Sequence, residues 1–537
     1  MKRKLSSVLA LLMVCVMVGC SAGGSGDTGG SAATQAAETG SSAAQDAGDA
    51  STTAEPAAEG KDTIILATSG EPYRFFAQGS QSCGGDDNLV LSNLYDCLLF
   101  LEPDGSLTEG LAESYEVSDD GLTYTFHLRE GVTFHNGMPM TAEDVKFTFD
   151  TGFQGPIGAA LFVNFESCDI IDDYTVEMHL TEPYAAFPYG VASRLGGIAC
   201  KAYYDEVGEE GYMAAPIGTG PYTFVEYVSG DHTTMAAYED YWRGAPPIKN
   251  VIIQTVADTN TQILGLQNGD YDIVRNPSID VCTRLDSDEN VGWNSTNSTG
   301  RITMSMSEWT GPASDKNFRK AVQAGINKDD INDAAFAGYA ETLDIDMCSN
   351  YGGYVTVADG IEVVEYDPEK AKEYLAASSY AGEEFAIMVN SGSTLETCAK
   401  VIQAQLMEIG INCQVRAVDN PTYQDGWNLR NYEGAYIVNN LSSLVDADGI
   451  ITGHRTDRWD EGLHYARDPE LYDLFMQGRA AQGDARKPFY VEGCNIITEE
   501  AYDVPLLNDI TTVAYRSELK NVLAHCLGNY NFRLYHY

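Results

Sequence analysis

Hydrophobic and polar residues alternate in the segment TYTFHL, residues 123–128. In an extended chain, the aromatic and leucine side chains of this segment fall on one face, and the threonines and His127 fall on the other. The pattern therefore predicts a β-strand with one buried face and one polar face.

A tight turn is predicted shortly after this strand, at Asn136-Gly137, because both residue types tolerate a positive φ. His135 immediately precedes the turn. Since the polar residues around His135 all have a structural explanation, we interpret this histidine as part of the scaffold and not as a catalytic residue.

Residues 141–149 carry the signals of a helix start. Thr141 and Asp144 have the spacing of a capping box, in which each residue satisfies a backbone amide of the other. Val145 and Phe149 lie one turn apart and form the apolar stripe that would dock the helix. A strand, a turn and a capped helix are therefore expected in succession.

Residues 393–418 predict a helix followed at once by a strand. Ser393 and Glu396 again have capping-box spacing, and Gly410 marks the helix end. The strand is INCQVRAV, residues 411–418. Together with a preceding strand these elements predict a βαβ unit, and the fold class α/β with mixed sheets. The apolar stripe of this helix consists of Cys398, Ile402, Leu406 and Ile409.

The first twenty residues have the pattern of an export signal. Basic residues at positions 2–4 precede an apolar run at 5–18, which is too short to span a bilayer. The sequence Met-Val-Gly-Cys at 17–20 resembles the lipobox of bacterial lipoproteins, and this resemblance implies that Cys20 becomes the lipidated N-terminus.

The next segment, 21–60, predicts a disordered tether. Thirty-one of its forty residues are Ser, Ala, Gly or Thr, and none is basic, aromatic or large aliphatic. Such a composition buries too little apolar surface to offset the entropy lost on ordering. After the tether no apolar run is long enough for a second membrane anchor, and the remaining residues are too many for one core.

The charge of the chain excludes one class of partner. With 79 acidic and 32 basic side chains among 537 residues, the net charge is −47, which repels nucleic acid. The twelve cysteines never form Cys-x-x-Cys, and the eight histidines are scattered, so we predict no metal site and no cofactor. Neither Gly-x-Ser-x-Gly nor His-Glu-x-x-His occurs, so we predict no catalytic residues.

A resemblance to a family covers most of the chain, roughly residues 62–537. The run from NLYDCLLF to DVKFTFD, residues 93–150, is similar to the N-terminal signature of the family 5 solute-binding proteins of ABC importers. PIGTGPYTFVEY and ILGLQNGDYDIV, at 216–227 and 263–274, resemble its central block, and DKNFRKAVQAGINKDDINDAAFAG, at 315–338, resembles a helix of its C-terminal lobe.

The resemblance implies a periplasmic-binding-protein-like fold (type II, cluster C) with three lobes and a ligand cleft that closes about a hinge. It also implies a small-molecule or peptide ligand, delivery to a permease and its ATPase, and a monomer lipid-anchored on the outer face of the cytoplasmic membrane, at the cell surface or in a periplasm. The implied lobes are lobe I at 61–98, 199–290 and 505–537, lobe II at 99–198, and lobe III at 291–504.

Three segments are expected to contact the ligand by this resemblance: a loop after the first strand, the start of the helix at 394, and the segment NNLSSLVDADGI at 439–450. A helix start also offers free amides to a carboxylate or carbonyl. The candidate ligand-binding residues are Ser82, Cys83, Gly84, Ser391, Gly392, Ser393, Thr394, Asn439, Asn440, Ser443 and Asp446.

Ser443 stands where many peptide receptors of the family carry an Asp that pairs with the α-ammonium group of the peptide. A hydroxyl does not replace a carboxylate opposite a buried cation. Either Asp446 or Asp448 takes over this role, or the ligand has no free α-amino group and is an oligosaccharide, an opine or a metal chelate. An exported lipoprotein without a transport role is the remaining alternative.

Overall fold

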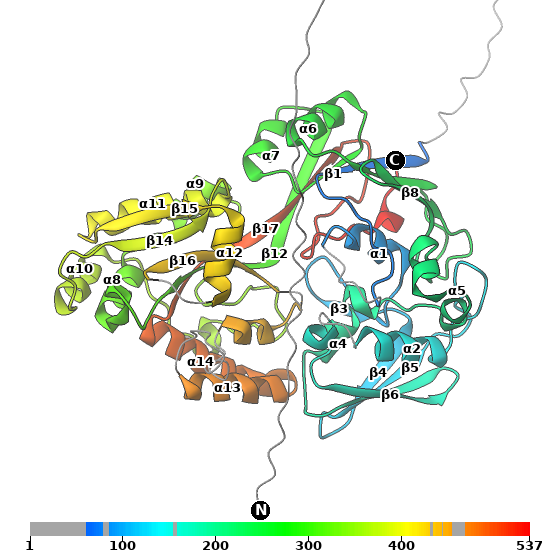
Figure 1. Cartoon of the computed structure of the whole chain (residues 1–537), viewed down its shortest axis with the longest axis horizontal. Coiled ribbons are helices and arrows are strands. Elements are labelled where there is room, and N and C mark those ends of the chain that lie inside the picture. The colour runs from blue at the N-terminus through cyan, green and yellow to red at the C-terminus, as the bar shows by residue number, and fades with distance from the viewer. Residues whose placement is uncertain (1–60, 79–84, 154–157, 430–432, 443, 454–467) are drawn as a thin grey trace, which may run out of the picture. The chain divides into compact units, whose positions relative to one another are not determined.

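The computed structural model describes residues 61–78, 85–153, 158–429, 433–442, 444–453 and 468–537 (Figure 1). Gly60–Tyr537 forms one compact unit. The export signal, Cys20 and the tether at 21–60 lie outside the described residues, so these interpretations stay predictions.

One eleven-stranded mixed sheet runs through this unit, in the order β15-β14-β16-β12-β17-β11-β1-β10-β9-β8, with β13 paired to β17. Its strands are β1 (Thr63–Thr68), β8 (Tyr222–Val228), β9 (His232–Ala237), β10 (Asn250–Thr255), β11 (Ile273–Arg275), β12 (Val291–Met306), β13 (Glu341–Thr342), β14 (Phe385–Asn390), β15 (Cys413–Val418), β16 (Ala435–Leu441) and β17 (Asp503–Arg516).

Two long antiparallel strands, β12 and β17, join the two ends of this sheet (Figure 1). Strand β17 continues onto β11 and the strands beyond it, here called the β1 end (β1 and β8–β11), whereas β12 continues onto β16 and the β14 end (β14–β16). The boundaries of the three predicted lobes are not tested by this arrangement and stay predictions.

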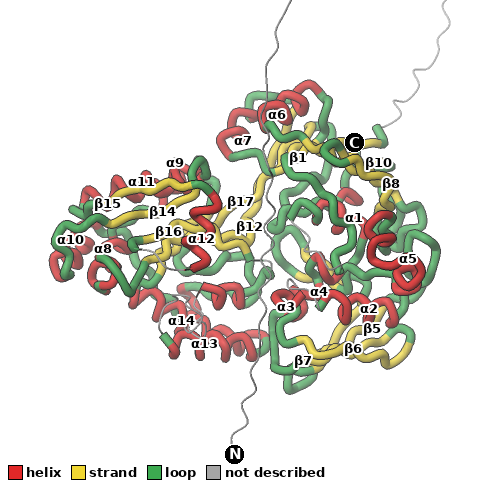
Figure 2. Tube along the Cα trace, in the orientation of Figure 1, coloured by secondary structure: helices red, strands yellow, loops and turns green. Residues whose placement is uncertain are grey.

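The predicted βαβ unit is present at the β14 end. β14 pairs in parallel with β15, and α11 (Thr394–Glu408) connects them. All four residues of the predicted apolar stripe are buried. The predicted capping box is wrong, because the Ser393 hydroxyl donates to the Asn390 carbonyl, and Glu396 accepts from the Gly392 amide. Figure 2 shows helices around the strands of this end.

A separate four-stranded antiparallel sheet, β4-β5-β7-β6, contains the alternating segment that predicts a strand. β5 spans Thr123–Leu128, with its aromatic and leucine side chains buried and His127 exposed, as predicted. α2 (Ala142–Gly152) packs on this sheet; its capping box forms between Thr141 and Asp144, and Val145 and Phe149 are buried. The other strands are β4 (Ala112–Val117), β6 (Phe165–Asp172) and β7 (Thr175–Leu180), and β2 (Leu99–Leu101) pairs only with β3 (Leu107–Glu109).

The remaining helices cover the sheets and fill the connections between strands. They are α1 (Asn88–Leu94), α3 (Gly158–Leu161), α4 (Phe187–Val191), α5 (Lys201–Ala214), α6 (Thr259–Asn268), α7 (Ile279–Leu285), α8 (Lys316–Ala324), α9 (Lys328–Phe336), α10 (Pro368–Ala377), α12 (Asn420–Leu429), α13 (Pro469–Ala480) and α14 (Lys487–Glu500). No helix in the described part of the chain is long and apolar enough to cross a membrane.

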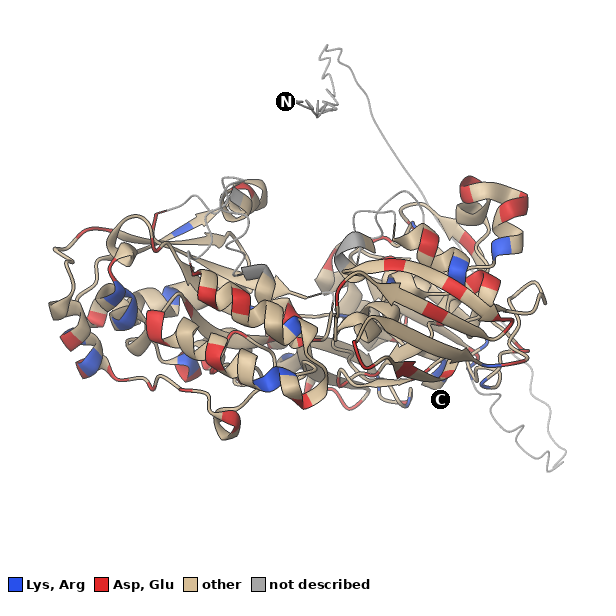
Figure 3. Cartoon of the chain, turned by 90° about the horizontal axis from the view of Figure 1, so that it is seen from below, with Lys and Arg blue, Asp and Glu red and all other residues tan. Residues whose placement is uncertain are grey.

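In Figure 3, acidic residues are spread over helices, strands and loops, and basic residues are fewer. This distribution agrees with a charge that solvates the protein generally. The nine cysteines within the described residues are all free thiols, and eight of them are buried.

His135 has a structural position. Its Nε2–H donates to the Gly220 carbonyl at 3.0 Å, and its Nδ1 accepts the Gly218 amide at 3.1 Å. Burial disfavours the charged ring and lowers the pKa of His135 to about 4. Of the predicted turn pair, only Gly137 has a positive φ, at 81°.

The His135 environment makes stability depend on pH. Because the folded-state pKa lies below the ordinary value of about 6.5, the unfolded chain takes up a proton first as the pH falls. The free energy of unfolding should therefore drop between about pH 6.5 and pH 4. Urea unfolding across this range should show a smaller drop for the variant His135→Gln. An equal drop in both proteins would contradict this account.

Candidate functional site

A cavity of about 580 Å³ lies where the two ends of the large sheet face each other across β12 and β17. The β1 end and its connections contribute Arg275 and the residues after it, and the β14 end contributes the end of β16 and Thr394 at the start of α11. Ser298 and Thr299 of β12 and residues 509–512 of β17 form the wall between them. The cavity therefore touches both ends and the strands that connect them.

An irregularity in the β12–β17 ladder shapes this wall. Asn297 pairs with Ile510 and Arg301 pairs with Asn508, so three residues of β12 lie opposite Asp509 alone. The Asn508 side chain donates to the carbonyls of residues 298 and 300, at 3.0 and 3.1 Å, which satisfies backbone groups that the ladder leaves unpaired. Bulges of this kind commonly lie beside binding sites.

Gly300, within the bulge, permits a close approach of polar side chains. A Cβ atom at this position would lie 2.3 Å from Asn439 Oδ1 and 3.0 Å from the Asp509 Cβ. Asn439 Nδ2 donates to Asp509 Oδ2 at 2.7 Å. Burial raises the pKa of Asp509, and the Asn439 hydrogen bond opposes this shift. Among the described residues, no cationic side chain forms an ion pair with Asp509.

The lining of the cavity also contains basic residues. Arg194 and Arg275 both line it, and the Arg275 guanidinium forms an ion pair with Asp86. The Nε atom of Arg275 is buried and has no hydrogen-bond partner in the described structure. Ser193 is 6% exposed, and its hydroxyl likewise lacks a partner there. The cavity therefore presents unsatisfied donors as well as a carboxylate.

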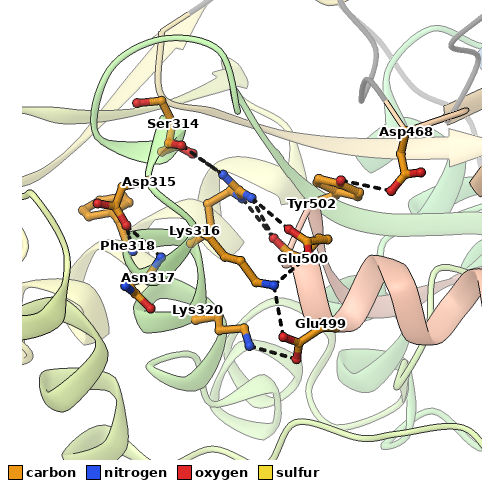
Figure 4. A network of polar contacts seen from close by, with 12 residues as sticks. Ser314, Asp315, Lys316, Asn317, Phe318, Lys320, Asp468, Glu499, Glu500 and Tyr502 are labelled. Atoms are coloured by element: carbon orange, nitrogen blue, oxygen red, sulfur yellow. Dashed lines mark hydrogen bonds and ion pairs between the residues drawn. The ribbon is translucent and has the colours of Figure 1, made fainter. Parts of the chain in front are cut away.

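A larger open hollow, of about 860 Å³, lies along α14. Its acidic lining already has structural roles at several positions. Lys316 and Lys320 of α8 bind Glu499, and Lys316 also binds Glu500 (Figure 4). Arg319 donates to the Glu500 carbonyl at 2.9 Å. These contacts attach α8 to the end of α14, and no residue of β12 or β17 lines the hollow. We therefore regard the 580 Å³ cavity as the candidate site.

Only some of the predicted ligand-binding residues lie at the cavity. Thr394 lines the cavity, and Asn439 holds Asp509 in its wall. Ser391, Gly392 and Ser393 precede α11 but do not line the cavity. Asn440 lies in β16 opposite Arg301 of β12. Ser82, Cys83, Gly84 and Ser443 lie outside the described residues.

Asp446 and Asp448 are engaged with arginines. Asp446 is fully buried, and both its oxygens accept from the Arg486 guanidinium. Asp448 accepts from Arg479 at 2.7 and 2.9 Å, and the Tyr184 hydroxyl donates to it at 3.2 Å. Neither carboxylate lines the cavity. A ligand-binding role for Asp446 stays a prediction.

Sequence reasoning missed Asp509, Arg275 and Ser193. Asn508 and Asp509 follow the apolar run VPLL. This polar pair inside a hydrophobic strand is the sequence signal that could have identified Asp509 as a site residue. Arg275 ends the strand of the motif ILGLQNGDYDIV, and nothing in its spacing relates it to residue 509. Within the described residues, no group of three or more His, Cys, Asp and Glu side chains could hold a metal ion.

Comparisons with known proteins agree on one family. The family model of bacterial extracellular solute-binding proteins, family 5 Middle, matches residues 106–459. The glutathione-binding protein GsiB of Escherichia coli (strain K12) is 30% identical over 376 residues, covering 68% of this chain and 70% of that protein. Its counterpart in Pectobacterium atrosepticum is 29% identical over 383 residues, with the same coverage.

Solved structures share the fold. The ABC transporter substrate-binding protein CtaP of Listeria monocytogenes has a TM-score of 0.80 at 22% identity, covering 89% of this chain and 99% of that one. NikZ of Campylobacter jejuni, in complex with Ni(L-His), has a TM-score of 0.72 at 22% identity, covering 89% and 100%.

The mixed α/β fold is that of a type II periplasmic binding protein, as predicted. The chain belongs to family 5 of the bacterial extracellular solute-binding proteins, and it is a solute-binding protein of an ABC importer. Members of this family bind substrates and are not enzymes.

The Asp446–Arg486 pair predicts a large loss of stability when one partner is removed. Arg486→Met should lower the free energy of unfolding by about 3–5 kcal/mol, because it leaves a buried carboxylate without its counter-ion. Arg416→Met breaks an exposed pair with Glu384 and should cost less than about 1 kcal/mol. Urea unfolding measures both values. If Arg486→Met lowers the free energy of unfolding only slightly, the ion pair is not the structural role of Asp446, and this account is contradicted.

Proposed function

We propose that the protein captures an oligopeptide or a related small solute in the 580 Å³ cavity and delivers it to a permease and its ATPase. The observation that carries this proposal is the position of the cavity, which is lined by both ends of the large sheet and by the strands that join them. A ligand that touches both ends favours the closed arrangement through its differential contacts.

The size and charge of the cavity favour a small ligand with charges of both signs. Its volume lies within the range usual for small-molecule sites. Asp509 and Asp280 line it together with Arg194 and Arg275. The relatives that are named glutathione-binding proteins support a peptide-like solute, since glutathione carries one amino group and two carboxylates.

We also propose the anchor and the division into lobes. Lipidation at Cys20 and the tether at 21–60 would hold the binding unit near the outer face of the membrane. Lobe II, at 99–198, contains the four-stranded sheet, while lobe I and lobe III correspond to the β1 end and the β14 end. The lipid anchor, the permease, the ATPase and the monomeric state complete this proposal.

A non-peptide solute is the second candidate, and the serine at position 443 favours it, because a neutral side chain stands where the family resemblance implies an ammonium-binding Asp. An opine or a metal chelate would place its carboxylates against Arg194 and Arg275.

A ligand screen tests the proposed function. Thermal unfolding of the purified protein should be measured with tripeptides including glutathione, with oligosaccharides, with an opine and with nickel–histidine. Binding only to the native state raises the melting temperature, by an amount set by concentration over Kd. We expect peptides with a free amino group to give the largest rise. The transport-receptor proposal fails if no solute class raises the melting temperature.

A further inference from the structure

We infer that Asp509 is the group that binds a cation of the ligand, so that this receptor selects solutes with a free ammonium group. This inference rests on the proposed function of the cavity. It assigns to strand β17 the role that the family resemblance assigns to the position of Ser443.

The carboxylate of Asp509 has no counter-ion within the part of the chain that the structure describes. Its described side-chain partner is Asn439, which donates one neutral hydrogen bond. A carboxylate withdrawn from water gains most from a cation that also donates hydrogen bonds. The ammonium group of a peptide meets both requirements.

The nearby arginines are already engaged by other carboxylates. Arg301, in the next paired position of β12, donates to Asp346 at 3.2 Å and is 1% exposed. Arg275, which also lines the cavity, is held by Asp86. These two guanidinium groups therefore each have their own acid, and among the described residues neither forms an ion pair with Asp509.

The other candidate carboxylates are unsuited to this role. Asp446 and Asp448 form bidentate pairs with Arg486 and Arg479 and do not line the cavity. Asp280 lines the cavity, but its carboxylate accepts from Arg284 at 3.0 Å on an exposed helix surface. Asp509 is the carboxylate that combines a cavity position, partial burial and a missing counter-ion.

The local backbone holds Asp509 in place for this task. Asp509 lies opposite the bulge of β12 and outside the regular ladder, and Asn508 fixes the bulge by donating to two β12 carbonyls. Gly300 leaves room for Asn439 beside it, and Asn439 Oδ1 is buried without a partner in the described structure.

The test compares Asp509→Asn with the unaltered protein, using four probes: glutathione, trialanine and the N-acetylated form of each. Asparagine keeps an oxygen that can accept the Asn439 hydrogen bond, but it removes the charge. Asp270→Asn, on the exposed turn after α6, removes the same charge away from the cavity and serves as the matched control. Isothermal titration calorimetry measures the affinities.

We expect the unaltered protein and Asp270→Asn to prefer each free amine over its acetylated form by at least tenfold. In Asp509→Asn this preference should fall to less than threefold, through weaker binding of the free amines alone. A preference that persists in Asp509→Asn overturns the inference. Equal binding of free and acetylated probes by the unaltered protein overturns it as well.

The outcomes separate this inference from the proposed function. If the unaltered protein binds an oligosaccharide or a chelate but no tripeptide, the inference fails and the proposed function stands. If it binds no solute class, both fail. The melting temperature of ligand-free Asp509→Asn should equal or exceed that of the unaltered protein, because a buried uncompensated charge is removed. A clear decrease would assign Asp509 a structural role and overturn the inference.

Discussion

The pairing of β12 with β17 is the constraint on which the rest of the structure depends. These strands pair with each other from the β1 end to the β14 end, so each end is built around half of the same two-stranded ribbon. Regular pairing would stiffen the ribbon and occupy its backbone groups throughout. The irregularity between Asn297 and Arg301 interrupts it at the cavity wall. The sheet thus supplies both the connection between the ends and a break that exposes side chains to a solute.

Charge is organised differently inside and outside this architecture. The acidic residues that give the net charge of −47 are spread along the chain, which favours general solvation of the protein over the recognition of one ligand. The buried acids Asp446 and Asp448 each have an arginine, because an unpaired charge in the interior is costly. Asp509, by contrast, lines the cavity, and its described side-chain partner is the neutral Asn439. The role of a carboxylate in this protein therefore depends on whether a cationic side chain lies beside it.

Local patterns predicted local structure well. The alternation in 123–128, the apolar stripe from Cys398 to Ile409 and the Thr141 capping box all follow from short-range geometry, and each is present. The Ser393 capping box failed because the Ser393 hydroxyl donates to the Asn390 carbonyl and the Glu396 carboxylate accepts from the Gly392 amide instead. The residues that line the cavity could not be predicted from such local patterns. Arg275 and Asp509 are separated by most of the β14 end in sequence and face one cavity only through sheet pairing.

The free thiols of the described residues have a consequence for how this exported protein matures. Eight of the nine are buried, and burial raises the pKa of thiols such as Cys168 and Cys413 to about 12, so they stay protonated and react slowly with oxidants. None of the nine contributes a covalent cross-link to the native state. For this part of the chain, acquiring the native fold outside the cytoplasm requires no thiol oxidase or isomerase. The stability of this part of the chain therefore does not depend on a disulfide bond formed within it.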